Sequence, residues 1–218
     1  MLTQLTTIKT RLAIPAYETE FEPVLLQFLQ HASARFELEC RRRFARDATA
    51  TYTFGALSRL ICADRYPIES VAKFELKTSE DEGWVEQSEV EYLLSPARAV
   101  IALASPLGTP GELGRVTFAG GYVLPGTSPQ TGQEPLPAEL EYSCVEQVAY
   151  WFENRNRLGL VSAGGGGGAV QLLQDLQLLP GNTSEKVTGS AWFKFTQVDL
   201  LPGVQAVLAR YRRMEGLT

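Results

Sequence analysis

The chain has 218 residues, of which 44% are hydrophobic and 21% are charged. This composition is typical of a globular protein with a sizeable core, and the length fits one domain with an insertion or two small domains. The net charge of −5 argues against a protein that grips nucleic acid over its whole surface, because such proteins carry a basic footprint. This charge is still compatible with DNA that passes close to the protein without being bound.

The three cysteines, Cys40, Cys62 and Cys144, are widely separated and form no Cys-x-x-Cys pair. This pattern argues against a disulfide framework or a zinc site and favours a reducing compartment. The N-terminus has no basic segment followed by an apolar run, so no signal peptide is expected, and no apolar run is long enough to cross a bilayer. We therefore expect a protein that folds in a cytoplasm and does not bind a membrane.

Two helices are predicted before residue 50. Residues 3–13 form a short helix that Pro15 ends, and residues 20–46 form a long helix with one continuous apolar stripe. The last turns of the long helix hold four arginines, which suit the negative end of the helix dipole. These arginines are Arg41, Arg42, Arg43 and Arg46.

Between residues 50 and 122 the sequence has the short β-branched and aromatic runs that are typical of strands. The segment 80–83 has turn chemistry and predicts a hairpin. The block therefore indicates a β-rich insertion between two long helices. Its strands are predicted at 50–54, 58–63, 69–77, 84–94 in two pieces, 98–103 and 115–119.

The second long helix is predicted from Pro137 to Gly159, because proline suits a helix start and glycine a helix end. Three consecutive aromatic residues, Tyr150, Trp151 and Phe152, cover more than one face of this helix. We expect at least one of them to point into an interface. The apolar face of the helix carries Leu140, Cys144, Val148, Trp151 and Phe152.

Five glycines at 164–168 follow this helix. A phosphate-binding loop needs Lys and then Ser or Thr after its last glycine, whereas Ala169 and Val170 follow here. A mobile tether is therefore the better interpretation of the glycine run.

The C-terminal part is predicted to hold a strand and a last helix. Residues 169–179 fit a helical or an extended conformation, and residues 186–196 alternate as a strand does. Pro202 begins a helix with an apolar face, which ends in Arg210, Arg212 and Arg213.

No residue set for catalysis, for a cofactor or for a metal is recognisable. His31 is the only histidine, and no nucleophile-elbow pattern accompanies it. A single histidine cannot supply a two- or three-histidine metal site. We therefore expect no enzyme activity.

Acidic residues cluster around the predicted hairpin. The alternation Glu89-Val90-Glu91 fits the solvated face of a half-buried strand, and another hypothesis is an acidic rim that repels DNA phosphates in a channel. Since paired carboxylates also hydrolyse glycosides, a carbohydrate-binding or hydrolytic module at 75–91 stays as an alternative. The cluster comprises Glu75, Glu80, Asp81, Glu82, Glu86, Glu89 and Glu91.

The arginine clusters have two interpretations, which the sequence leaves open. They cap helix ends, or they pair with acidic groups on a neighbouring subunit or another protein. A ring built from one repeated contact needs two different complementary patches per subunit, and the acidic hairpin is a candidate opposite patch. The candidate inter-subunit residues are Arg41, Arg42, Arg43, Arg46, Glu80, Asp81, Glu82 and Trp151.

Several segments, in their order along the chain, resemble the head–tail connector (adaptor) proteins of long-tailed bacteriophages and related gene-transfer particles. The strongest is Val-Thr-Phe-Ala-Gly-Gly-Tyr at 116–122, which a loop joins to a helix-forming segment. The other segments that carry the resemblance are 6–14, 40–44, 65–71, 136–140, 154–159 and 200–213. The glycine run is not part of the pattern.

The resemblance implies a structural protein of the virion neck. It implies a ring, usually of twelve copies, that docks on the portal protein, extends the DNA channel and offers a surface to a tail-completion or stopper protein. Genomic DNA would pass through the lumen without sequence recognition, and the chain would assemble in the host cytoplasm. The alternative is another neck or tail-completion protein of the same particle.

The resemblance also implies that the C-terminal segment reaches toward the portal. The candidate portal-facing residues are Leu200, Leu201, Pro202, Val204, Leu208, Tyr211, Arg212 and Arg213.

The predicted fold is α+β. It is a small helical bundle of two long helices plus short N- and C-terminal helices, with a β-rich insertion between the long helices. The predicted domains are a helical connector domain with a C-terminal arm, formed by 1–49 and 123–218, and the β-rich insertion at 50–122.

Overall fold

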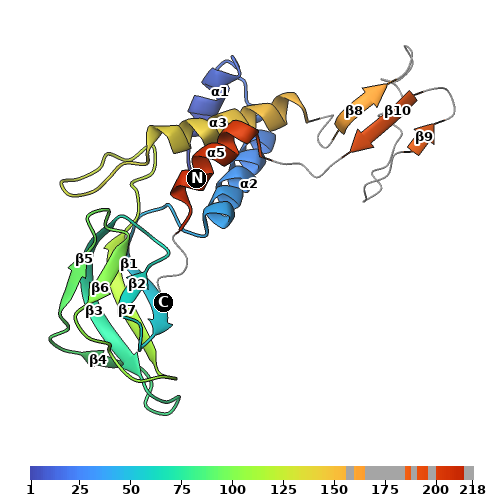
Figure 1. Cartoon of the computed structure of the whole chain (residues 1–218). Coiled ribbons are helices and arrows are strands. Elements are labelled where there is room, and N and C mark those ends of the chain that lie inside the picture. The colour runs from blue at the N-terminus through green and yellow to red at the C-terminus, as the bar shows by residue number, and fades with distance from the viewer. Residues whose placement is uncertain (156–159, 165–184, 188–190, 196–199, 214–218) are drawn as a thin grey trace.

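The computed structural model describes residues 1–155, 160–164, 185–187, 191–195 and 200–213; for the strands between 160 and 195 it describes only the backbone. A group of helices lies between a β-sandwich and a small sheet (Figure 1). The predicted α+β class is confirmed.

Four helices of the described residues share one core. α1 (Leu5–Arg11), α2 (Glu22–Cys40) and α5 (Pro202–Tyr211) each contact α3 (Ala138–Glu153), which crosses the group in Figure 1. Burial of their apolar faces holds the helices together. The core side chains include Ile8, Leu25, Leu29, Phe36, Leu140, Val148, Val204 and Leu208.

The long helix α2 ends at Cys40, whereas the sequence predicts its end at residue 46. Arg41 adopts a left-handed conformation with φ of +51°, and its N–H bonds back to the carbonyls of Glu37 and Leu38. This left-handed cap ends the helix without the usual glycine. No basic residue lies in the last turn of α2, so the predicted position of the arginines within the helix is wrong, and Arg41 instead forms its C-cap.

The helix α3 begins after Pro137 as predicted, but it ends at Glu153 and not at Gly159. The side-chain amide of Asn154 donates to the carbonyl of Tyr150 at 2.9 Å. The same carbonyl also accepts from the backbone N–H of Asn154 at 3.0 Å, so Asn154 holds the end of the helix through two hydrogen bonds.

The β-sandwich consists of two antiparallel sheets. The first has the order β1-β7-β3-β4, formed by β1 (Asp47–Gly55), β7 (Leu113–Gly120), β3 (Ile68–Lys77) and β4 (Val85–Gln87). Its strands alternate buried and exposed residues, so one face turns to the core and the other to solvent.

The second sheet has the order β2-β6-β5, formed by β2 (Leu60–Cys62), β6 (Val100–Leu103) and β5 (Tyr92–Leu94). Both sheets bury their inner faces in one core, which is separate from the helical core. Each predicted strand of the region 50–122 corresponds to an observed one, and the predicted hairpin turn at 80–83 joins β3 to β4. The sandwich core includes Phe54, Ile61, Phe74, Ile101, Val116 and Phe118.

A small third sheet follows α3. It has the order β8-β10-β9, formed by β8 (Leu160–Gly164), β10 (Ala191–Phe195) and β9 (Glu185–Val187). The single strand predicted at 186–196 is therefore two antiparallel strands. The first glycine of the run ends β8, and the rest of the run and the segment 169–179 lie outside the described residues.

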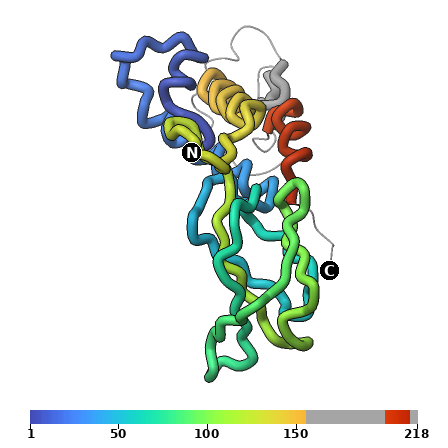
Figure 2. Tube along the Cα trace, turned by 90° about the vertical axis from the view of Figure 1, so that its left-hand side faces the viewer, coloured from blue at the N-terminus to red at the C-terminus, as the bar shows by residue number. Residues whose placement is uncertain are grey.

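The helices and the sandwich meet at a junction that the chain crosses between α2 and β1 and again after β7 (Figure 2). The N–H of Tyr122 donates to the carbonyl of Phe44, and the N–H of Arg46 donates to the carbonyl of Tyr122, both at 2.8 Å. This close approach explains the Gly-Gly pair at 120–121. A Cβ on Gly121, whose φ is +101°, would lie 2.7 Å from the carbonyl oxygen of Ala45.

Candidate assembly surfaces

Arg42 lies inside the junction and is only 3% exposed. Its guanidinium carbon lies 3.2 Å from the centroid of the Tyr66 ring and within 5.4 Å of the ring centroids of Phe44 and Tyr122. It also donates a hydrogen bond to the carbonyl of Tyr66. A cation enclosed by aromatic rings stabilises the protein's own fold. The prediction that Arg42 contacts a neighbouring subunit is therefore wrong.

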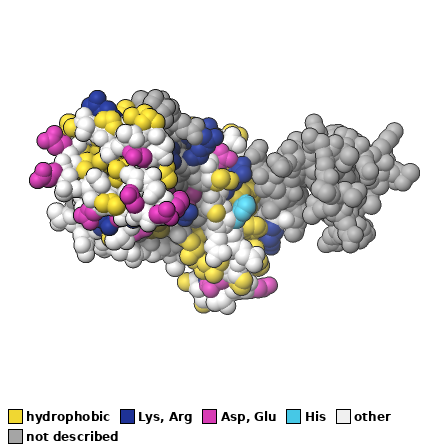
Figure 3. All heavy atoms as spheres, turned by 90° about the horizontal axis from the view of Figure 1, so that it is seen from below, with side chains coloured by type: hydrophobic (Ala, Val, Ile, Leu, Met, Phe, Trp, Pro, Cys, Tyr) yellow, Lys and Arg dark blue, Asp and Glu magenta, His cyan; other side chains and the backbone are white. Residues whose placement is uncertain are grey.

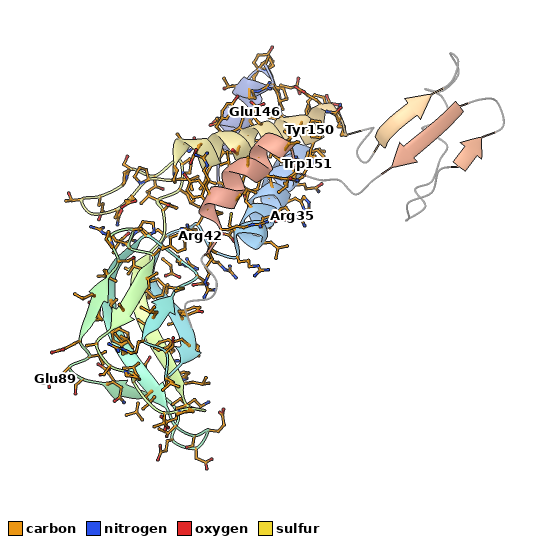
Figure 4. All side chains as sticks on the ribbon, in the orientation of Figure 1. Arg35, Arg42, Glu89, Glu146, Tyr150 and Trp151 are labelled. Atoms are coloured by element: carbon orange, nitrogen blue, oxygen red, sulfur yellow. The ribbon has the colours of Figure 1, made fainter. Side chains whose placement is uncertain are left out.

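The other arginines of the cluster lie in the same segment between α2 and β1, whose Arg42 is labelled in Figure 4. Arg46 makes a bidentate ion pair with Glu69, with both N–O distances at 2.8 Å, and this carboxylate raises the pKa of Arg46. Arg41 and Arg43 are exposed. The role of these two arginines in an interface stays a prediction.

The last helix, α5, is docked on the helical core. Leu200, Val204 and Leu208 are buried there. Their burial within the subunit means that they do not form a portal-facing surface in this fold, so that part of the prediction is wrong. Pro202 is exposed and Leu201 is half-buried.

The end of α5 is tied to both parts of the molecule. The N–H of Arg213 donates to the carbonyl of Cys40, and its guanidinium donates to the Tyr52 hydroxyl and, at 2.6 Å, to the carbonyl of Cys62. Arg212 pairs with Glu39 at 3.2 Å. These contacts hold the segment across the junction, and the role of Arg212 and Arg213 at the portal stays a prediction.

A second ion pair fixes the same helix to α3. The half-buried hydroxyl of Tyr211 and the guanidinium of Arg210 both donate to the carboxylate of Glu139. The hydrogen bond from Tyr211 lowers the pKa of Glu139, and burial together with this bond raises the pKa of Tyr211.

The acidic cluster divides into one buried carboxylate and an exposed rim. Glu75 is buried in the outer face of the first sheet, where it accepts from Arg115 at 2.7 Å and from Lys73 at 3.0 Å. The hydrogen bond from Arg115 lowers the pKa of Glu75 to about 2. A carboxylate this acidic stays ionised at neutral pH and is a poor general acid.

The three hairpin residues Glu80, Asp81 and Glu82 are exposed at the far end of the sandwich from the helices. Lys77 pairs with Glu80 and the hydroxyl of Thr78 donates to Glu82. The hairpin and the arginines of the junction thus lie at opposite ends of the sandwich. Their pairing across a subunit boundary stays a prediction.

His31 is exposed on α2, with its ring centroid 5.1 Å from that of Trp151. Hydrophobic side chains surround it at the surface (Figure 3). Trp151 itself is buried in the helical core and also contacts Phe28, so the prediction that Trp151 faces a neighbouring subunit is wrong. Of the three consecutive aromatics, Tyr150 is the one that is exposed.

Two stripes of exposed and half-buried side chains run along the helices, and they were not identified from the sequence. The first, which we name the α2 stripe, comprises Val24, Phe28, His31, Arg35 and Leu38. The second, the α3 stripe, comprises Glu139, Tyr142, Glu146, Tyr150 and Glu153. Their spacings of three and four residues place the members of each stripe on one helix face. That spacing is visible in the sequence, but apolar and charged positions are mixed within it.

The described residues hold no group of three or more His, Cys, Asp or Glu side chains that could bind a metal ion. All three cysteines are free thiols, and burial raises the pKa of Cys40 to about 11 and that of Cys144 to about 12. Among the described helices none is long and apolar enough to cross a bilayer.

A cavity of about 210 Å³ lies between α2 and α5. Its two charged residues, Glu39 and Arg212, pair with each other. Leu200, Gln205 and Leu208 complete its lining. This composition provides no free acid or base for chemistry.

No protein-family model matches this sequence, and neither does any curated protein. Among solved structures, a chain in the neck of an empty GTA (gene transfer agent) particle, computed with C6 symmetry, is similar over 99% of this chain and 91% of that chain. The TM-score is 0.56 and the sequence identity 14%. At this identity the likeness shows a shared fold.

Two further chains have TM-scores below 0.5, which is too low to show a shared fold. A chain in the neck of a native GTA particle, computed with C12 symmetry, has a TM-score of 0.42 at 17% identity, over 72% of this chain and 85% of that chain. A chain in the virion of a native GTA particle has a TM-score of 0.46 at 13% identity, over 90% of this chain and 81% of that chain.

Proposed function

We propose that this chain is a structural protein of the neck of a phage-like particle or gene transfer particle. One observation carries the proposal: the fold is shared, over almost the whole of both chains, with a chain in the neck of a GTA particle. The arrangement of residues supports it, because large apolar and aromatic side chains such as Leu38, Leu93 and Tyr142 are exposed outside the two cores.

Within the neck, we assign the chain to the head–tail adaptor. It forms a ring on the portal protein, extends the DNA channel and offers its outer rim to a tail-completion or stopper protein. The segments that resemble the adaptor family, above all 116–122 with its Gly-Gly pair at the junction, favour this position over another in the neck. The two cores act as two units in this assignment: a helical connector unit and a β-rich unit.

The distribution of charge supports a channel that does not grip DNA. Residues 47–122 contain six basic and eleven acidic residues, a net charge of −5, so the rest of the chain is neutral overall. Phosphates are repelled by such a surface, and DNA would slide past it without sequence recognition.

The test is the location of the chain in a purified particle. We expect an affinity label on the chain to appear at the head–tail junction by electron microscopy. Removal of the gene should leave DNA-filled heads without tails. A label on the head shell or the tail tip, or complete tailed particles without the chain, would contradict the proposal.

A further inference from the structure

The α2 stripe and the α3 stripe each expose large apolar or aromatic side chains in a row. Leu38 is 67% exposed and Tyr142 is 65% exposed, and Val24 and Tyr150 are exposed as well. Each stripe spans fourteen residue steps, from 24 to 38 and from 139 to 153, or roughly 21 Å of helix. The two stripes therefore match each other in length.

The stripes belong to different faces of the helical group. α1 and α5 flank the α3 stripe, since Arg11 pairs with Glu146 and Arg210 pairs with Glu139. In Figure 4, Glu146 on α3 and Arg35 on α2 lie on opposite sides of the group. One subunit can therefore present both stripes to two different neighbours at the same time.

The stripes are also complementary in chemistry. The α2 stripe has three apolar members, a histidine and an arginine, and no acidic residue. The α3 stripe has two tyrosines and three glutamates. Arg11 and Arg210 of the neighbouring helices pair with Glu146 and Glu139, and Glu153 is exposed to meet a basic group of another chain. Arg35 keeps 39% of its side chain exposed although it pairs with Glu39, so it can still reach a carboxylate of another chain. Tyrosine and arginine are enriched at protein interfaces.

We propose that the α2 stripe of one copy of this chain binds the α3 stripe of the next copy. This inference rests on the proposed function and names the contact that builds the ring. The contact is head-to-tail, which closes into a ring when the rotation between copies allows it.

The experiment uses full-length chains and analytical ultracentrifugation over a range of concentrations. We expect Leu38→Asp and Tyr142→Asp each to weaken self-association at least about tenfold, because each places a charge at the most exposed apolar or aromatic side chain of its stripe. The matched controls are Leu93→Asp on β5 and Tyr17→Asp in the loop before α2, whose side chains are 76% and 85% exposed. We expect the controls to associate as the unchanged chain does.

A mixing experiment tests the head-to-tail direction. Each of the two variants keeps one intact stripe, so an equimolar mixture should form heterodimers, although neither variant associates alone. A variant pair that does not form heterodimers, or controls that are impaired as strongly, would overturn the assignment of the two stripes.

Cross-linking detects the contact even when self-association is too weak for ultracentrifugation. In a Cys62→Ser background, the double variant Leu38→Cys, Tyr142→Cys should give a ladder of multimers with a short bifunctional maleimide, whereas each single variant should stay monomeric. Multimers without that ladder, or single variants that cross-link as dimers, would contradict this interface. They would not affect the proposed location of the chain in the neck, which is tested separately in purified particles. The absence of any multimer would overturn the inference as a whole.

Discussion

Arg42 shows at the scale of one residue how the structure changes the meaning of a charged cluster. Four arginines between 41 and 46 suggest a binding patch, but Arg42 is enclosed by aromatic rings within the subunit. Nothing in the local sequence distinguishes it from Arg43, which is exposed. The difference arises from Tyr66 and Tyr122, which are distant in sequence and close in the fold.

We expect Arg42→Lys to lower the free energy of unfolding by about 2–4 kcal/mol, since a lysine loses the planar stacking on the rings and the fixed hydrogen bond to Tyr66. Urea denaturation measures this. Arg43→Lys is the matched control and should change stability by less than about 0.5 kcal/mol. Equal effects of the two substitutions would show that Arg42 has no special role at the junction.

Glu75 predicts a pH dependence of stability. Its pKa in the folded protein is lowered to about 2, below its usual value of 4.5, by Arg115 and Lys73. The stabilisation is therefore complete above about pH 4.5 and is lost as the pH falls toward about 2, because the carboxylate must then be protonated in the fold.

Glu75→Gln should remove this part of the acid dependence, and it should cost about 1–3 kcal/mol at neutral pH because Arg115 keeps only a weaker acceptor. The measurement is the free energy of unfolding at pH values from 2 to 7. Glu89→Gln, at an exposed position, should leave the profile unchanged. An acid profile of Glu75→Gln identical to that of the unchanged chain would disprove the role of this ion pair.

At the scale of elements, the Gly-Gly pair at the end of β7 sets how the sandwich joins the helices. The chain passes within 2.7 Å of where a Cβ on Gly121 would lie, and the same glycine has a positive φ. Two requirements meet at one residue: a left-handed backbone and room for the segment between α2 and β1.

We expect Gly121→Ala to destabilise the protein clearly more than Gly111→Ala does. Gly111 has a similar φ of +95°, but a Cβ added there would have no atom within 4 Å, so its substitution should cost only the backbone strain of about 1 kcal/mol. Thermal unfolding of both variants, compared at one temperature, decides this. Equal losses would mean that the contact with Ala45 does not constrain the junction.

The elements that the sequence predicts well are those whose signal is local. The alternation in β7 and the turn chemistry at 80–83 give the strands and the hairpin, and Pro137 gives the start of α3. The end of α2 was missed because a left-handed cap at an arginine leaves no glycine in the sequence. The sequence predicts one strand at 186–196 where the structure has two, because the alternation of apolar and polar residues does not show where the chain turns back.

The candidate surfaces were harder to predict than the fold. The sequence predicts interface positions for Trp151 and Leu208, yet both are buried by helices that are far away in sequence. Tyr142 and Leu38 were not identified, because exposure depends on which helix faces the core already covers. A helix spacing alone does not separate a core face from a docking face.

At the scale of the whole molecule, two separate cores are joined by one junction that Arg42, Arg213 and the Gly-Gly pair stabilise. The helical unit exposes the α2 stripe and the α3 stripe, and the β-sandwich carries the net negative charge. This division suits a ring in which helices contact helices and the sandwich stays available to other proteins of the neck.

The most direct test of a neck adaptor is native mass spectrometry of the 24.0 kDa chain mixed with the purified portal protein of its particle, and separately with the tail tube. We predict a complex with the portal in which one copy of the chain is bound per portal subunit, and no complex with the tail tube. A chain that forms no complex with the portal and binds the tail tube would contradict the account.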